Sequence, residues 1–170
     1  QENGPAEGAI TSVFASSTGT IYSSTFAGML YRTTDDGVHW LKIGSGLPDG
    51  IKPVFSLAEN SRGILFAGLE RVPSTSQSDG VYRSTDGGDT WLAINPFAPG
   101  RHSFGALAIG PDDVMYARLD AMIYRSTDDG DTWQTTGWTN LDQIVALSID
   151  PDGKIYAGGG IQGIYRSTDE

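Results

Sequence analysis

The sequence contains no cysteine, only two histidines and no long apolar run. The absence of cysteine excludes disulfides, thiol catalysis and cysteine-ligated metal sites. No run reaches the ~20 apolar residues that a membrane helix needs, so insertion into a membrane is not expected. Basic residues are also scarce, because 11 Lys and Arg stand against 21 Asp and Glu, for a net charge of −10. This charge disfavours nucleic acids and anionic membrane surfaces as partners.

One eight-residue segment recurs along the chain. It reads TTDDGVHW from Thr33, STDGGDTW from Ser84 and STDDGDTW from Ser126, and a shorter STDE begins at Ser167. These starts lie 51, 42 and 41 residues apart, and each follows an apolar residue, a Tyr and an Arg. A period of this length indicates a repeat architecture in which each repeat is one supersecondary unit.

Each segment has the composition of a tight turn between two strands. The central Asp-Gly or Gly-Gly tolerates the positive φ angles of such a turn. The leading hydroxyl and the Asp two positions later can accept backbone N–H groups, and the closing Trp can bury its ring beside the outgoing strand. We therefore predict a structural role for these positions, which are Thr33, Asp35, Gly37, Trp40, Ser84, Asp86, Gly88, Trp91, Ser126, Asp128, Gly130, Trp133, Ser167 and Asp169.

The pattern S/T-x-D-x-G-x-x-W resembles the Asp-box, or BNR, repeat of sialidases, sortilin-type receptors, some xyloglucan hydrolases and secreted bacterial β-propellers. Three full copies and one partial copy make the resemblance specific for the repeat but not for an activity. It covers roughly residues 10–170. It implies an all-β propeller of four-stranded antiparallel blades, in which the boxes are structural rather than catalytic.

Short apolar runs separated by turn residues predict about four meander blades and no helix. We expect an N-terminal arm at residues 1–8 and one propeller domain or segment at 9–170, with blades at about 9–43, 54–94, 104–136 and 144–170. The first strand of each later unit is almost entirely apolar or small, as in VFSLA, FGALAI and IVALSI. This pattern predicts burial on both faces around the propeller axis.

The fourth unit has no fourth strand, and β proteins normally cover an unpaired strand edge. We therefore interpret the segment as part of a larger propeller, since propellers of the resembling family commonly have more blades. The alternatives are a closed four-blade ring and self-association, in which a second copy completes the unpaired blade edge.

The two faces of the predicted ring differ, because alternate connections of a meander lie at the same end. The boxes share one face, the box face, with the turns between first and second strands. The opposite connection face carries loops that do not repeat, which is where a rigid scaffold usually places function. The candidate ligand-binding residues there are Arg71, Arg101, His102, Arg118, Asp120, Trp138, Asp142 and Gln143. Trp138 lies outside the boxes and would suit stacking on a sugar, with packing between blades as the alternative.

We predict a non-catalytic binding propeller of an exported protein, secreted or at the cell surface, because the resembling proteins are exported. It would present the connection face to a glycan or protein partner. The alternatives are a glycoside hydrolase or sialidase-like enzyme completed by further blades, and a purely structural scaffold. No catalytic residue is predicted, because no pair of carboxylates stands out as a glycosidase requires. No cofactor or metal is predicted, since the boxes lack the D-x-D-x-D-G spacing of a calcium loop.

Overall fold

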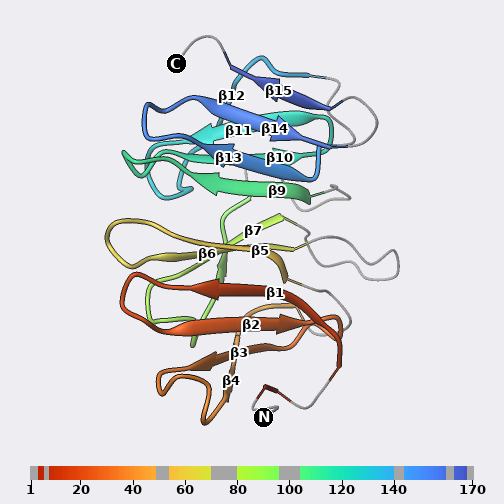
Figure 1. Ribbon diagram of the computed structural model, residues 1–170. Helices are drawn as coiled ribbons and strands as arrows, with labels where there is room; N and C mark the ends of the chain where they lie inside the picture. Colours follow the sequence, from red (N-terminus) through yellow and green to blue (C-terminus); the bar gives the residue numbers. More distant parts are fainter. Residues whose placement is uncertain are drawn as a thin grey trace.

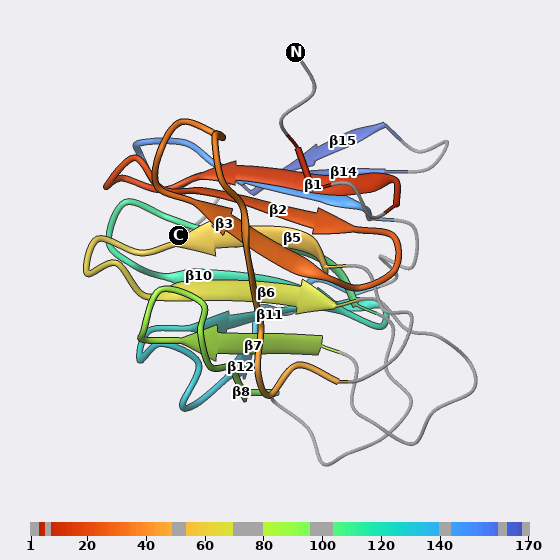
Figure 2. The same cartoon turned by 90° about the horizontal axis from the view of Figure 1, so that it is seen from below.

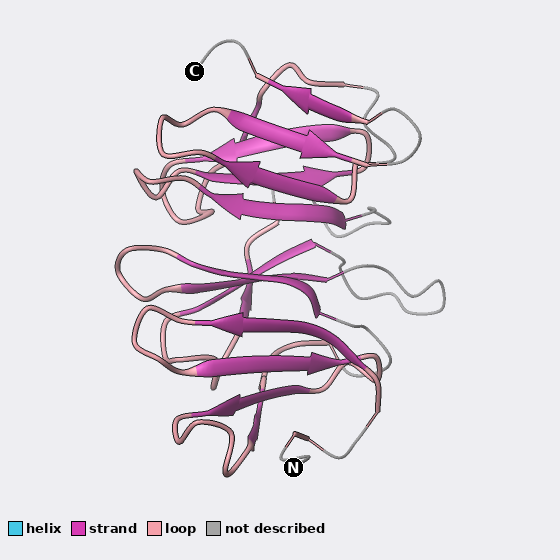
Figure 3. Ribbon diagram, viewed as in Figure 1, coloured by secondary structure: helices cyan, strands magenta, loops and turns pink. Residues whose placement is uncertain are grey.

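The computed structural model describes residues 4–5, 8–48, 54–69, 80–95, 104–139, 144–159 and 163–167. Within these residues all regular structure is β, in fifteen strands (Figures 1 and 3). No helix in this part of the chain is long and apolar enough to span a membrane. The all-β class predicted from the sequence is confirmed.

Four antiparallel sheets follow one another along the chain, and neighbours in each sheet are consecutive in sequence. Blade 1 comprises β1 (Ile10–Ala15), β2 (Ile21–Thr25), β3 (Leu30–Thr33) and β4 (Leu41–Ile43). Blade 2 comprises β5 (Val54–Glu59), β6 (Leu65–Leu69), β7 (Gly80–Ser84) and β8 (Leu92–Ala93). Blade 3 comprises β9 (Phe104–Ile109), β10 (Met115–Leu119), β11 (Met122–Ser126) and β12 (Gln134–Thr135). Blade 4 comprises β13 (Ala146–Ile149), β14 (Ile155–Gly158) and β15 (Ile164–Arg166).

The blades are stacked in chain order, from the red blade 1 to the blue blade 4 in Figure 1. The first strands β1, β5, β9 and β13 contact one another in succession. Figure 2 shows the turns after these strands gathered on one side of the stack, the left in this view, together with the boxes. The arrangement therefore separates a box face from a connection face, as a stack of meanders requires.

Apolar side chains fill the junctions between successive blades. In β6, Leu65, Ala67 and Leu69 pack in a cluster with residues of blade 1. The alternate residue Phe66 packs in a cluster with residues of blade 3. This follows from the period of two in a strand, which sends successive side chains to opposite sides. A third cluster fills the junction between blades 3 and 4.

Each junction is completed near the connection face by a different contact. In blade 1, the hydroxyl of Ser24 donates to the carbonyl of Val54, with Oγ and O 2.7 Å apart. In blade 2, Gly68 leaves room for the buried ring of Phe104, and a β-carbon added there would lie 1.9 Å from its Cζ. Blade 3 has Arg118 at the corresponding position, since Gly68 and Arg118 are both fourth in their strands.

The first strands are less buried than their apolar sequences predict. Residues of β13 alternate between exposed and half-buried, and Val13 of β1 and Val145 beside β13 are 67% and 69% exposed. The prediction of burial on both faces is wrong for β13, because Leu147 and Ile149 pack in the cluster with blade 3 whereas Ala146 and Ser148 lie on the side of blade 4 that no other blade covers in the described part of the chain.

Candidate functional site

Each of the three full boxes folds as a turn that is held by its own polar groups. In box 2, the Ser84 hydroxyl donates to Asp86 at 2.7 Å and accepts from the Gly88 N–H at 2.9 Å. The Asp86 carboxylate also accepts the backbone N–H of Thr90 at 2.9 Å and its hydroxyl at 2.5 Å. The indole Nε1 of Trp91 donates to the Gly88 carbonyl at 2.9 Å. The central pair Gly87 and Gly88 has φ angles of 72° and 91°, the left-handed region that such a turn demands.

Boxes 1 and 3 repeat this geometry with two differences at their ends. In box 3, the indole Nε1 of Trp133 donates across the junction to the carbonyl of Ile94 in blade 2, at 2.7 Å. In box 1, His39 replaces the threonine, and its Nδ1 lies 2.7 Å from an oxygen of Asp35. The indole Nε1 of Trp40 is buried and has no hydrogen-bond partner within the described residues.

These hydrogen bonds hold the box carboxylates in their charged form. The Thr90 hydroxyl, followed by the Thr90 backbone N–H, lowers the pKa of Asp86 to about 2. The backbone N–H and then the side chain of His39 lower the pKa of Asp35 to about 2, and the Thr132 hydroxyl lowers the pKa of Asp128. Carboxylates whose lone pairs are used inside a turn are poor candidates for proton transfer.

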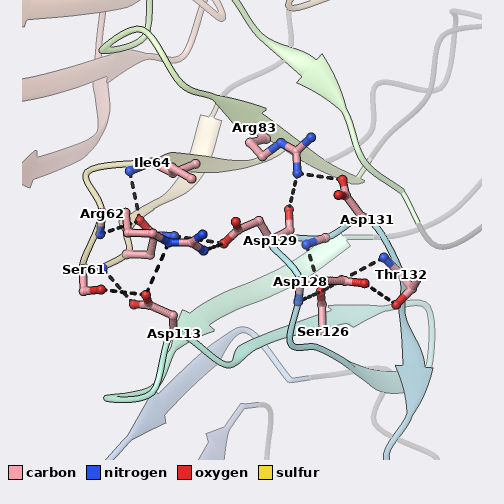
Figure 4. A network of polar contacts seen from close by, with 12 residues as sticks. Ser61, Arg62, Ile64, Arg83, Asp113, Ser126, Asp128, Asp129, Asp131 and Thr132 are labelled. Carbon is pink, nitrogen blue, oxygen red and sulfur yellow. Dashed lines mark hydrogen bonds and ion pairs between the residues drawn. The ribbon is translucent and has the colours of Figure 1, made fainter.

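The boxes also join neighbouring blades, as Figure 4 shows for blades 2 and 3. Arg83 Nη1 donates to the Asp129 carbonyl at 3.0 Å and to the Asp131 carboxylate at 2.8 Å. Arg62 pairs with the Asp129 carboxylate, and its Nε lies 3.8 Å from an oxygen of Asp113. The polar groups of this face are therefore used between blades.

The junction of blades 1 and 2 uses the same contacts. Arg32 Nη1 donates to the Gly87 carbonyl at 2.8 Å and lies 3.0 Å from the Asp89 carboxylate. The hydroxyl of Tyr22 donates to the same carbonyl at 3.2 Å. The repeated arginine thus recognises the fourth and sixth positions of the following box.

On the connection face, the structure brings two predicted ligand-binding residues together. Arg118 is 4% exposed, and its Nη1 donates to the carbonyl of Asp120 in the turn between β10 and β11. Its guanidinium lies where a β-carbon at Gly105 would be, so that glycine makes room for it. Asp120 is exposed. Contact of Arg118 with a ligand stays a prediction, and it would require the guanidinium to become accessible.

Trp138 is half-buried and packs against the apolar cluster of blades 3 and 4, which includes Ile123, Ile144 and Ile155. Its backbone carbonyl accepts the Ile123 N–H at 3.4 Å. Its ring therefore contributes to packing between blades. The other candidates, Arg71, Arg101, His102, Asp142 and Gln143, lie outside the described residues, as does Asp169 of the fourth box.

The sequence did not predict a pocket of about 320 Å³ at the axis, lined by Ser56, residues 104–107 and residues 145–147. We refer to it as the axial pocket. It lies among the first strands of blades 2, 3 and 4, toward the connection face where β9 and β13 begin. None of its lining residues has a titratable side chain. The small residues Gly105, Ala106 and Ala146 on adjacent first strands are the signal that could have indicated it.

A second pocket of about 300 Å³ opens on the box face between blades 3 and 4, and Tyr116 and Arg125 are among its lining residues. At the other two junctions, the corresponding arginines contact the following box. The residues that follow Ser167 lie outside the described part of the chain, so this pocket is not assigned to a ligand. Within the described residues, no group of three or more His, Asp or Glu side chains could hold a metal ion.

No protein-family model and no curated protein matches this chain. Solved structures of other proteins do match this chain. The extracellular domain of the hybrid two component system BT4673 from B. thetaiotaomicron matches with a TM-score of 0.73 and 19% identity, over 98% of this chain and 22% of that one. The GH74 xyloglucanase from Xanthomonas campestris matches with a TM-score of 0.73 and 23% identity, over 95% of this chain and 28% of that one.

The Dos1 propeller matches with a TM-score of 0.68 and 12% identity, over 92% of this chain and 44% of that one. The chain thus spans less than half the length of each of these three proteins. At these identities the matches show the fold, which is a β-propeller built of antiparallel blades. The resemblance to Asp-box propellers that the motifs indicate is confirmed at this level.

Proposed function

We propose that this segment is a non-catalytic binding propeller that presents its connection face, with the axial pocket near the centre, to a glycan or protein partner. The observation that carries the proposal is that no titratable side chain lines the axial pocket. The box acids and the arginines Arg32 and Arg83 are used inside turns and between blades, whereas the axial pocket is lined by residues without titratable groups.

The pocket has the size and chemistry of a recognition site. Its volume lies at the lower end of the range for ligand pockets, which is about 300–1,000 Å³. Phe104, Leu107 and Val145 provide apolar surface, and Ser56 provides a hydroxyl at its edge. Such a lining suits the apolar face of one sugar ring or one apolar side chain of a protein partner.

The similarity to GH74 xyloglucanases supports hydrolysis of a glycan as the alternative function. Glycosidases act with two carboxylates on opposite sides of the scissile bond. Among the described residues of the connection face, Asp120 is the only carboxylate. The described residues of this face therefore provide no such pair of carboxylates, and we propose binding rather than hydrolysis.

We also propose that the protein is exported from the cytoplasm. One of the similar structures is the extracellular domain of a hybrid two component system, which supports a location outside the cytoplasm. The absence of cysteine is compatible with such a location, because a propeller of this size has enough core to fold without disulfides.

A glycan array that includes xyloglucan oligosaccharides tests the proposal, with the wild type compared with Val145→Lys and Val13→Lys. Both valines are exposed on first strands or beside them, but only Val145 lines the axial pocket. Glycans that the wild type binds should no longer be bound by Val145→Lys and should still be bound by Val13→Lys. Equal effects of both variants would refute the pocket as the site. Release of reducing sugar from xyloglucan by the wild type would favour the enzyme instead.

A further inference from the structure

Two of the three methionines accept a hydrogen bond from a tyrosine of the same strand region. The Tyr31 hydroxyl donates to Sδ of Met29 at 3.3 Å. The Tyr124 hydroxyl donates to Sδ of Met122 at 3.5 Å. In each pair the methionine stands two residues before the tyrosine, and the period of two in a strand places both side chains on the same side. The chain thus builds the same sulfur–phenol pair twice, in blades 1 and 3.

Both pairs lie where the chain enters a third strand from the connection face. Met29 directly precedes β3, and Met122 is the first residue of β11. Both methionines are half-buried, whereas the paired Tyr31 and Tyr124 are 8% and 7% exposed. The third methionine, Met115, is 1% exposed. A small oxidant in solution therefore has access to Met29 and Met122 but not to Met115.

The repeat itself does not require a methionine at this position. Blade 2 has Gly80 and blade 4 has Gly163 two residues before the tyrosine. A β-carbon at Gly80 would lie 2.0 Å from Oδ1 of Asn95, so blade 2 leaves no room for a side chain there. Because these blades form with glycine at this position, construction of a blade does not explain the two methionines.

We propose that Met29 and Met122 are sites of oxidation to methionine sulfoxide by hydrogen peroxide, and that the paired tyrosine binds the oxygen that is added. The sulfur lone pair attacks one peroxide oxygen, the O–O bond breaks and an S–O bond forms. The departing hydroxide takes the proton of the transferred hydroxyl and leaves as water. Sulfur is oxidised by two electrons, and the peroxide is reduced. The reaction needs no ligand in the axial pocket, so it is independent of the proposed binding function.

The tyrosine hydroxyl suits the product better than the reactant. A thioether sulfur is a weak acceptor, whereas a sulfoxide is polar. Burial, and then the charge of Asp120, raises the pKa of Tyr124, so its phenol keeps the proton that the hydrogen bond needs. Met122 also packs against the cluster between blades 2 and 3, where a polar group without a partner is costly. The Tyr124 hydroxyl therefore limits the loss of stability that oxidation of Met122 causes.

Peptide mass spectrometry after brief exposure of the folded protein to hydrogen peroxide tests the choice of sites. Met29 and Met122 should each gain one oxygen, and Met115 should react at least about tenfold more slowly. In urea all three should react at similar rates, because the fold no longer protects Met115. Equal rates in the folded protein, or protection of Met29 or Met122, would overturn the proposal.

Thermal unfolding before and after oxidation tests the role of the tyrosine. In a Met29→Leu background, Met122 is the one accessible sulfur. Oxidation should lower the melting temperature by about 2–4 °C more in Tyr124→Phe than in the chain that keeps Tyr124. The matched control is Tyr82→Phe, which removes the corresponding hydroxyl from a blade with glycine in place of methionine and should leave the effect of oxidation unchanged. Equal effects of oxidation in Tyr124→Phe and Tyr82→Phe would show that the phenol does not bind the sulfoxide, which contradicts the proposal.

Discussion

Replacement of Gly68 by alanine tests how blades 2 and 3 fit together. The added β-carbon would lie 1.9 Å from Cζ and 2.3 Å from Cε1 of Phe104. Carbon atoms in contact are normally about 3.5–4.0 Å apart, so the ring would have to move by about 1.5 Å or more. Phe104 is buried in the junction cluster, and a displaced ring would have to leave that cluster for the axial pocket that it lines. We expect Gly68→Ala to lower the free energy of unfolding by about 1–3 kcal/mol, as overpacking does.

Gly158→Ala is the matched control. Gly158 has the corresponding position in β14, and a β-carbon there would meet only Cγ1 of Ile164, at 3.9 Å. That distance is an ordinary contact. Because alanine also reduces the entropy of the unfolded chain, we expect Gly158→Ala to be neutral or stabilising by up to about 1 kcal/mol. The difference between the two variants isolates the clash with Phe104.

Urea unfolding followed by circular dichroism, on Gly68→Ala, Phe104→Leu and the double variant, completes the test. Leucine lacks the atoms closest to the added β-carbon, so Phe104→Leu should relieve the clash although it costs about 1 kcal/mol alone. The double variant should be more stable than the sum of the single effects by about 1 kcal/mol or more. Additivity within about 0.5 kcal/mol would refute the packing argument.

Three further predictions concern the polar contacts. The lowered pKa values of about 2 for Asp35 and Asp86 mean that their stabilising contribution is complete above the unfolded value of about 4 and is lost as the pH falls toward 2. Asp86→Asn should therefore reduce the loss of stability across this pH range in urea titrations, and an unchanged slope would contradict the box geometry. Trp133→Phe removes the hydrogen bond from the indole to the Ile94 carbonyl and should lower the free energy of unfolding by about 1 kcal/mol more than Trp40→Phe does. The Nε1 of Trp40 has no hydrogen-bond partner among the described residues. Equal losses of stability in the two variants would count against the bond to Ile94. Arg83→Met should lower the free energy of unfolding by about 1–2 kcal/mol, less at high salt, and no loss would show that blades 2 and 3 do not depend on it.

The sequence predicts the boxes well because their contacts are local. The hydroxyl of Ser84 and the carboxylate of Asp86 bond to groups at most four residues away, so residue type and spacing nearly determine the turn. Strand positions follow from the period of two, and β9 is predicted to the residue. The outer strands β4, β8 and β12 each begin one residue after the box tryptophan. In box 2 the tryptophan belongs to the turn, because the indole of Trp91 donates to the carbonyl of Gly88.

The candidate site is less predictable because it depends on contacts between distant residues. The repeat predicts the turn that contains Asp120, but Arg118 belongs to strand β10 and its burial depends on Gly105 in the adjacent strand β9. The axial pocket needs three first strands that are separated by about one repeat each. No local pattern encodes which small residues of these strands will lie opposite one another.

We propose that the boxes hold the blades together while the axial pocket binds a partner. Calorimetric titration of Val145→Lys and Asp128→Asn with a xyloglucan oligosaccharide, at a temperature where both variants are folded, tests it most directly. The account predicts that Val145→Lys keeps the wild-type stability and loses binding, whereas Asp128→Asn loses stability and keeps binding. Loss of binding with Asp128→Asn and its retention with Val145→Lys would place recognition on the box face and contradict the account.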